Sequence, residues 1–85
     1  MTNTNHETSD DYAAVVANLT DDLRVITCKG GIQWILQKRD KGSAERPWVA
    51  KGYFRTRKAL MRVGAGLGAP TDKLEALPAT FIPTN

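Results

Sequence analysis

Three short runs in the middle of the chain predict strands, and along the second run apolar and polar residues show the alternation of a half-buried strand. The runs span residues 24–28, 32–39 and 48–54, and they are rich in β-branched and aromatic residues. Gly30 and Gly31, between the first two runs, are typical of a hairpin turn. After Thr56 the apolar spacing becomes that of an amphipathic helix with an N-cap. The expected fold class is α+β, a three-stranded antiparallel sheet covered by a C-terminal helix.

Weaker patterns on either side predict two further short elements. Residues 10–19, DDYAAVVANL, carry one apolar helical stripe behind two acids, which favours a short N-terminal helix. The glycine-rich run at 64–68 should end the main helix, and residues 72–77 can form one more short turn or helix. The chain is then expected to divide into a disordered acidic leader, one small domain and a flexible tail, at residues 1–9, 10–77 and 78–85.

Strict alternation assigns the apolar side chains of the sheet to two faces. One set is expected beneath the helix: Trp34, Leu36, Trp48 and Phe54. The other set points away from the helix: Ile35, Val49 and Tyr53. Two interpretations of this second face remain open. Either the 10–19 helix covers it, or it is an exposed apolar patch of the kind that marks contact surfaces.

Charge is segregated along the 85 residues more sharply than the net charge of +3 suggests. Residues 1–22 contain five acids and neither Lys nor Arg, whereas residues 23–68 contain eleven bases and two acids. Such a basic core attracts anionic partners, either the phosphate backbone of nucleic acid or an acidic protein face.

Catalytic and metal chemistry find little support in the residue inventory. Cys28 is the one cysteine and is expected to be a buried, inert thiol, and His6 is the one histidine and lies in the polar leader. Ser43 lies in a polar loop and has no histidine near it in the sequence, so a nucleophile with a base is not expected. We expect a non-enzymatic protein without cofactor or metal. The absence of a signal segment and the single cysteine favour the cytoplasm.

Two stretches carry a resemblance to a known family. Trp34 to Gln37 reads WILQ and Phe54 to Leu60 reads FRTRKAL, and the similarity covers roughly residues 20–65. On these stretches the chain resembles the QseM-like quorum-sensing antiactivators, small proteins of conjugative elements and plasmids. The resemblance implies a protein that binds a LuxR-type transcriptional activator of element transfer and holds it inactive. It supplies no interface residues.

The residues themselves favour a binding surface on the second face of the sheet. Apolar anchors and basic neighbours are expected to contact the partner through Ile35, Val49, Lys51, Tyr53, Arg55 and Arg57. The alternative function is direct DNA binding through the basic three-stranded sheet, because Arg, Lys and Gln alternate with aromatic residues along the strands. The order of three strands followed by one helix also resembles, more loosely, that of the AP2-type DNA-binding domain.

Overall fold

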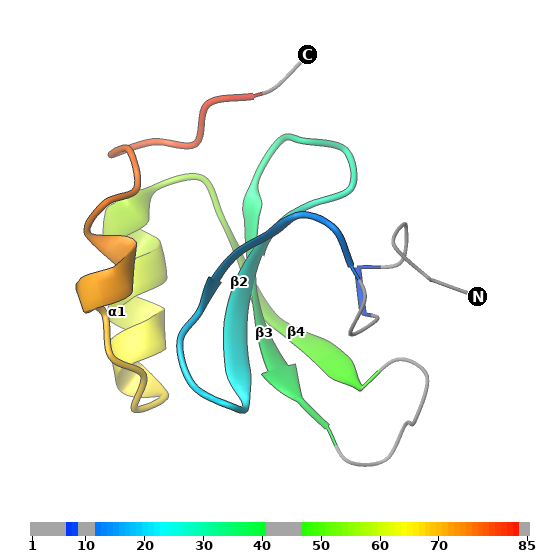
Figure 1. Cartoon of the computed structure of the whole chain (residues 1–85). Helices are drawn as coiled ribbons and strands as arrows, with labels where there is room; N and C mark the ends of the chain where they lie inside the picture. Colours follow the sequence, from blue (N-terminus) through cyan, green and yellow to red (C-terminus); the bar gives the residue numbers. More distant parts are fainter. Residues whose placement is uncertain (1–6, 9–11, 41–46, 84–85) are drawn as a thin grey trace.

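In the computed structural model, residues 7–8, 12–40 and 47–83 are described. Within these residues the chain forms one antiparallel sheet, one α-helix and one 3-10 turn (Figure 1). The elements are β1 (Val15–Asn18), β2 (Leu23–Thr27), β3 (Trp34–Arg39), β4 (Trp48–Phe54), α1 (Arg57–Gly66) and η1 (Asp72–Leu74). The strands pair in chain order, β1-β2-β3-β4. The α+β class and the covering helix are therefore confirmed, but the sheet has four strands and not three.

The additional strand replaces the N-terminal helix that the 10–19 pattern predicted. Val15 to Asn18 pairs antiparallel with β2, and the backbone N–H groups of Leu19 and Thr20 both donate to the Leu23 carbonyl, at 2.9 and 3.1 Å. An isolated helix of ten residues is only marginally stable in water. The edge of the adjacent β2–β3 hairpin can instead form backbone hydrogen bonds with this segment, whose two valines favour a strand. Residues 10 and 11 lie outside the described residues.

The limits of α1 follow the capping signals in the sequence. The Thr56 hydroxyl accepts a hydrogen bond from the Ala59 N–H at 3.3 Å, as an N-cap does. At the other end Gly68 has a φ of 83°, and the Ala69 N–H donates to the Gly64 carbonyl at 3.0 Å. Leu67 continues the apolar spacing of the helix in the sequence, but the helix has already ended at Gly66, so Leu67 lies in the cap and is exposed.

A β-bulge in β4 changes which side chains share a face. Leu36 pairs with Gly52, but the next β3 residue, Gln37, pairs with Ala50, so Lys51 has no partner on β3. Beyond the bulge every β4 side chain therefore points opposite to the face that strict alternation assigns.

Two face assignments made from the sequence are wrong for this reason. Trp48 pairs with Arg39 and lies on the face away from α1, where it was expected beneath the helix. Val49 pairs with Lys38 and lies on the α1 side, where it was expected on the opposite face beside Ile35 and Tyr53.

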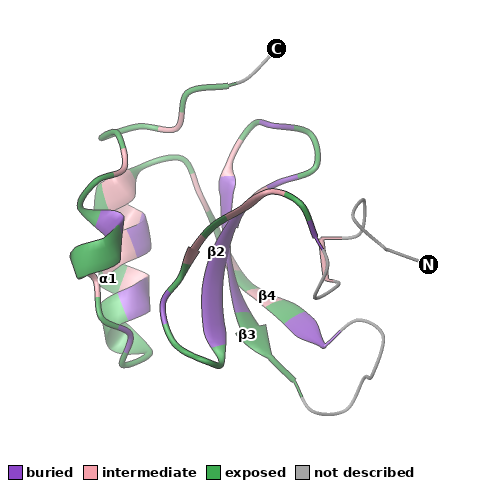
Figure 2. Ribbon diagram, in the orientation of Figure 1, coloured by how far each residue is buried: buried purple, intermediate pink, exposed green. Residues whose placement is uncertain are grey.

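Each face of the sheet has its own hydrophobic cluster. Figure 2 shows buried residues along nearly the whole of β2, which lies between the two clusters. The cluster beneath α1 is the larger and consists of Leu19, Leu23, Val25, Trp34, Leu36, Leu60, Ala69 and Leu74. The opposite cluster consists of Tyr12, Ile26, Cys28 and Ile35. Figure 1 shows α1 on one side of the sheet and the short blue segment of residues 7–8 on the other.

The segment after α1 is held against the domain. The expected extra helix is a 3-10 turn of three residues, with Leu74 fully buried. Thr80 forms a β-bridge with Thr56, and the Phe81 ring meets Trp34 edge-to-face at 5.2 Å. No helix in the described part of the chain is long and apolar enough to cross a membrane.

Candidate interaction surface

Four of the six residues that the sequence analysis selected as partner-binding are exposed on or beside β4. Val49 is 40% exposed and Tyr53 is 61% exposed, and the side chains of Lys51 and Arg55 are exposed as well. We call Val49, Lys51, Tyr53 and Arg55 the β4 surface. Because of the bulge, Val49 projects on the α1 side and Tyr53 on the opposite side. The β4 surface therefore wraps the outer strand of the sheet from both faces.

The other two selected residues are engaged inside the domain. Ile35 is only 2% exposed and packs in the cluster with Tyr12, so the expectation of an exposed anchor at Ile35 is wrong. The reason is that Tyr12, Ala14 and Val15, although not helical, pack on this part of the sheet. The Arg57 guanidinium donates to the backbone carbonyls of Glu75 and Leu77, at 3.1 and 2.7 Å, and so ties the segment after η1 to the start of α1.

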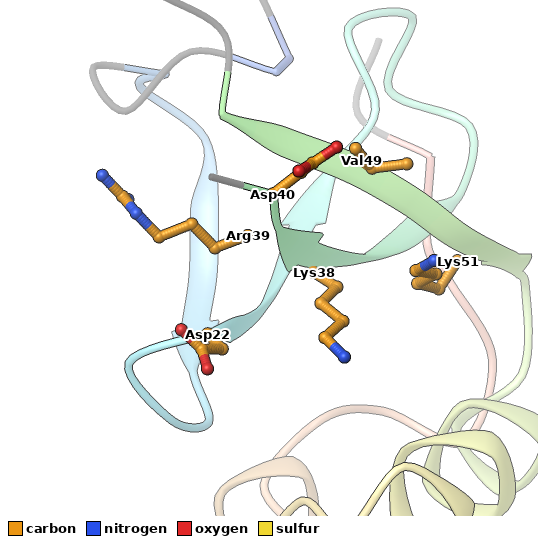
Figure 3. Close-up of a pocket in the computed structure, with 6 residues that line it drawn as sticks. All are labelled: Asp22, Lys38, Arg39, Asp40, Val49 and Lys51. Carbon is orange, nitrogen blue, oxygen red and sulfur yellow. The ribbon is translucent and has the colours of Figure 1, made fainter. Parts of the chain in front are cut away.

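An open depression of about 460 Å³ lies at the end of the sheet next to the β4 surface. It is lined by Asp22, Lys38, Arg39, Asp40, Val49 and Lys51 (Figure 3). Figure 3 shows that the charged ends of Lys38 and Arg39 point in different directions. Since its cations do not converge on one point, the depression resembles part of a broad contact surface more than a pocket for a small anion.

A buried polar network on the face away from α1 was not anticipated from the sequence. Arg24 and Gln37 are 2% and 1% exposed, and the Arg24 Nε donates to the Gln37 Oε1 at 2.7 Å. Both side chains also donate to the Glu7 carbonyl, from Arg24 Nη2 at 3.0 Å and from Gln37 Nε2 at 2.8 Å. The signal in the sequence is Arg24 itself, since a charged residue within an apolar strand needs hydrogen-bond partners when it is buried.

Trp48 and the N-terminal residues complete this network. The Arg24 guanidinium lies 4.2 Å from the centre of the Trp48 ring, and that of Arg39 lies 5.4 Å from it, both within the range of cation–π attraction. The Trp48 backbone N–H donates to the Thr8 carbonyl at 3.2 Å. The Glu7 carboxylate accepts a hydrogen bond from the Lys29 backbone N–H. Glu7 and Thr8 belong to the leader that was predicted to be disordered. Here they have defined hydrogen bonds to the sheet.

Tyr12 covers the apolar part of the same face. Its hydroxyl donates to the Thr27 carbonyl at 2.8 Å, and its side chain packs with Ile26 and Ile35. Burial raises the pKa of Tyr12, and the nearby Glu7 carboxylate raises it further, against a lowering by Arg24. The phenol therefore stays protonated at neutral pH and continues to donate to the strand.

The residues that could serve as metal ligands or nucleophiles do not form a site within the described part of the chain. Within the described residues no group of three or more His, Cys, Asp or Glu side chains is placed to hold a metal ion. The thiol of Cys28 is buried, as expected, and its sulfur accepts a hydrogen bond from the Ile32 N–H at 3.3 Å. His6 and Ser43 lie outside the described residues.

No protein-family model matches the chain, and no curated protein or solved structure matches it either.

Proposed function

We propose that this protein is a non-enzymatic regulator that binds an acidic face of a transcriptional activator through its β4 surface and thereby holds the activator inactive. One observation carries the proposal. The outer strand of the sheet presents two exposed apolar side chains, Val49 and Tyr53, and two exposed cations, Lys51 and Arg55, on or beside it. Interfaces combine large apolar anchors with charged residues around them, and aromatic anchors supply much of the binding energy.

Charge complementarity defines the chemistry of the partner. Lys51 and Arg55 belong to the basic part of the sequence, residues 23–68, which contains eleven basic and two acidic residues. Lys38 on β3 is exposed and lies on the same face as Val49, with which it pairs. Clustered positive charge accelerates encounter with an acidic surface and disfavours a basic one, so an acidic protein face fits.

The resemblance to QseM-like antiactivators supports a LuxR-type activator as that partner. The stretch FRTRKAL, which carries part of the resemblance, begins at the end of β4 and runs into α1. Binding would inhibit by occlusion. The face of the activator that contacts the β4 surface could no longer form the activator's own dimer or contact DNA.

Co-purification with a purified LuxR-type activator, together with transcription from a promoter that this activator controls, tests the proposal. The double variant Lys51→Glu/Arg55→Glu should lose most binding and relieve repression, since it places acids against an acidic face. The matched control is Lys58→Glu/Arg62→Glu, which makes the same charge change at two exposed positions on α1. The control should bind like the unchanged protein. No retention of the activator at low salt, or equal loss in both double variants, would contradict the proposal.

Direct DNA binding is the second candidate, supported by the same exposed cations and by the arginines at the Trp48 ring. The arrangement of the opposite face weighs against it. The residues suited to reading bases from the sheet are buried and hydrogen-bonded to the backbone of Glu7 or Thr8: Arg24, Gln37 and Trp48. A mobility-shift series over increasing salt separates the two functions, because phosphate contacts make affinity fall steeply with ionic strength. A salt-sensitive shift that Lys51→Glu/Arg55→Glu abolishes would favour DNA.

A further inference from the structure

The side of β4 that faces away from β3 is open along the middle of the strand. β4 is the last strand in the order β1-β2-β3-β4, and within the described residues no strand pairs with its outer side. Among the described residues, backbone hydrogen bonds to this side of β4 occur at the two ends of the stretch, from the Trp48 backbone N–H to Thr8 and between residues 55–57 and the tail. An unpaired edge presents a row of N–H and C=O groups that another extended chain can bind.

The tail shows that this part of the molecule accepts an extended segment. The Arg57 N–H donates to the Ala79 carbonyl at 2.9 Å, and the Phe81 N–H donates to the Arg55 carbonyl at 2.6 Å. These two bonds form an antiparallel bridge immediately after β4. The open stretch, Val49 to Tyr53, directly precedes the segment that is already paired in this way.

The side chains around the open stretch favour a heterologous acidic strand over a second copy of this chain. Lys51 lies at the centre of the stretch, so two copies paired across a two-fold axis would bring Lys51 close to Lys51. Like charges opposite one another destabilise strand pairing, and an edge lysine is a common protection against self-association. A strand carrying Asp or Glu would instead meet opposite charge at Lys51 and Arg55.

A fifth strand would also contact both exposed apolar residues of the β4 surface. Successive side chains of a strand point to opposite faces of the sheet. Apolar residues on the added strand would therefore reach Val49 on the α1 side and Tyr53 on the other side.

We infer that the partner binds by strand addition: an extended acidic segment pairs with the outer side of β4 from Val49 to Tyr53 and extends the sheet to five strands. This inference rests on the proposed function, because it specifies how the activator would engage the β4 surface. Main-chain hydrogen bonds supply affinity in this mode, and side chains at alternate positions supply specificity.

A nuclear magnetic resonance titration of the isotope-labelled full chain with a synthetic peptide tests the inference without the activator. The probe is a capped eight-residue peptide in which pairs of valines alternate with pairs of glutamates, so that each face of the added strand carries both residue types. Its control is the same peptide with lysine for glutamate. The glutamate peptide should shift the backbone amides of residues 49–53 and slow their hydrogen exchange, and the lysine peptide should do neither. Lys51→Glu should weaken binding of the glutamate peptide by about threefold to tenfold, from the loss of one cross-strand charge pair and its replacement by repulsion. Lys58→Glu should leave it unchanged.

The outcomes separate this inference from the proposed function. Shifts confined to residues outside β4, or equal shifts with both peptides, would overturn strand addition even if the activator is retained in co-purification. Protection of β4 by the glutamate peptide supports strand addition. If no activator is then retained, the proposed function fails although the binding mode stands.

Discussion

The two faces of the sheet are closed by different means. Beneath α1, aliphatic and aromatic side chains from the strands, the helix and η1 fill a continuous core, with Leu36 and Leu60 fully buried. On the other face a small apolar cluster borders a buried guanidinium and a buried amide, which are satisfied by the backbone of Glu7. The first face is stabilised by area removed from water, and the second by directional hydrogen bonds to the N-terminal segment.

This difference teaches that the two faces should respond differently to mutation. Apolar packing loses free energy in proportion to the volume removed. A hydrogen-bonded network fails locally when one member leaves others without partners.

The largest effect is expected for Leu36→Ala on the α1 face. Leu36 has no exposed surface and packs in the larger cluster, so truncation should lower the free energy of unfolding by about 2–5 kcal/mol. Chemical denaturation followed by tryptophan fluorescence measures the loss. Tyr53→Ala on the β4 surface is the control and should change stability far less. A loss below about 1 kcal/mol for Leu36→Ala would show that the α1 face is not the main core.

A smaller and more local effect is expected for Gln37→Ala on the opposite face. The change leaves the Arg24 Nε without its Gln37 acceptor and removes one of the two side-chain donors to the Glu7 carbonyl. The loss of stability should be about 1–3 kcal/mol, the cost of leaving buried polar groups unsatisfied.

Hydrogen exchange at the Lys29 amide distinguishes a local from a global effect of Gln37→Ala. That amide donates to the Glu7 carboxylate, so release of Glu7 should speed its exchange more than the exchange of β2 amides. Uniform acceleration across the sheet would mean instead that the network is part of one cooperative core.

The end of α1 offers a matched pair of substitutions with opposite signs. Gly68 has a φ of 83°, so Gly68→Ala should destabilise the protein by about 1 kcal/mol. Gly66 is the last residue of α1, and a Cβ there would meet no atom within 4 Å, so Gly66→Ala should stabilise by about 0.4–1 kcal/mol. Thermal unfolding of both variants measures the difference. The same sign for both would show that the α1 face does not depend on this cap.

The smallest effect at neutral pH belongs to Tyr12, since its phenol titrates only in alkali. In Tyr53→Phe, Tyr12 is the one remaining tyrosine, and its absorbance titration should have a midpoint above the usual value of about 10. Because the folded-state pKa is raised, the stabilising contribution is complete below the unfolded-state pKa and is lost as pH rises through the folded-state pKa. A midpoint at the usual value would show that Tyr12 is not buried against the sheet.

Much of the fold was predictable because local signals agreed with the tertiary outcome. The hairpin glycines, the Thr56 cap and the glycines after α1 act within a few residues, so the sequence alone locates three strands and the helix. Residues 10–19 failed for the opposite reason. Their apolar residues satisfy a helical stripe, but pairing with β2 supplied hydrogen bonds that no local pattern reveals.

The candidate site was predictable only in part, and a single residue accounts for much of the failure. Lys51, Tyr53 and Arg55 are exposed as expected, whereas the bulge at Lys51 moved Trp48 and Val49 to faces that strict alternation had not assigned. Ile35 is buried and does not belong to the exposed surface, because Tyr12, distant in the sequence, packs against it.

The sequence by itself determined the class of the fold, the limits of α1 and the concentration of positive charge around β4, since these depend on residue type and near neighbours. The tertiary structure alone decided which side chains are accessible. Strand register, one unpaired residue in β4 and the position of Glu7 against Arg24 and Gln37 are long-range choices, and they are set by the packing of the whole domain.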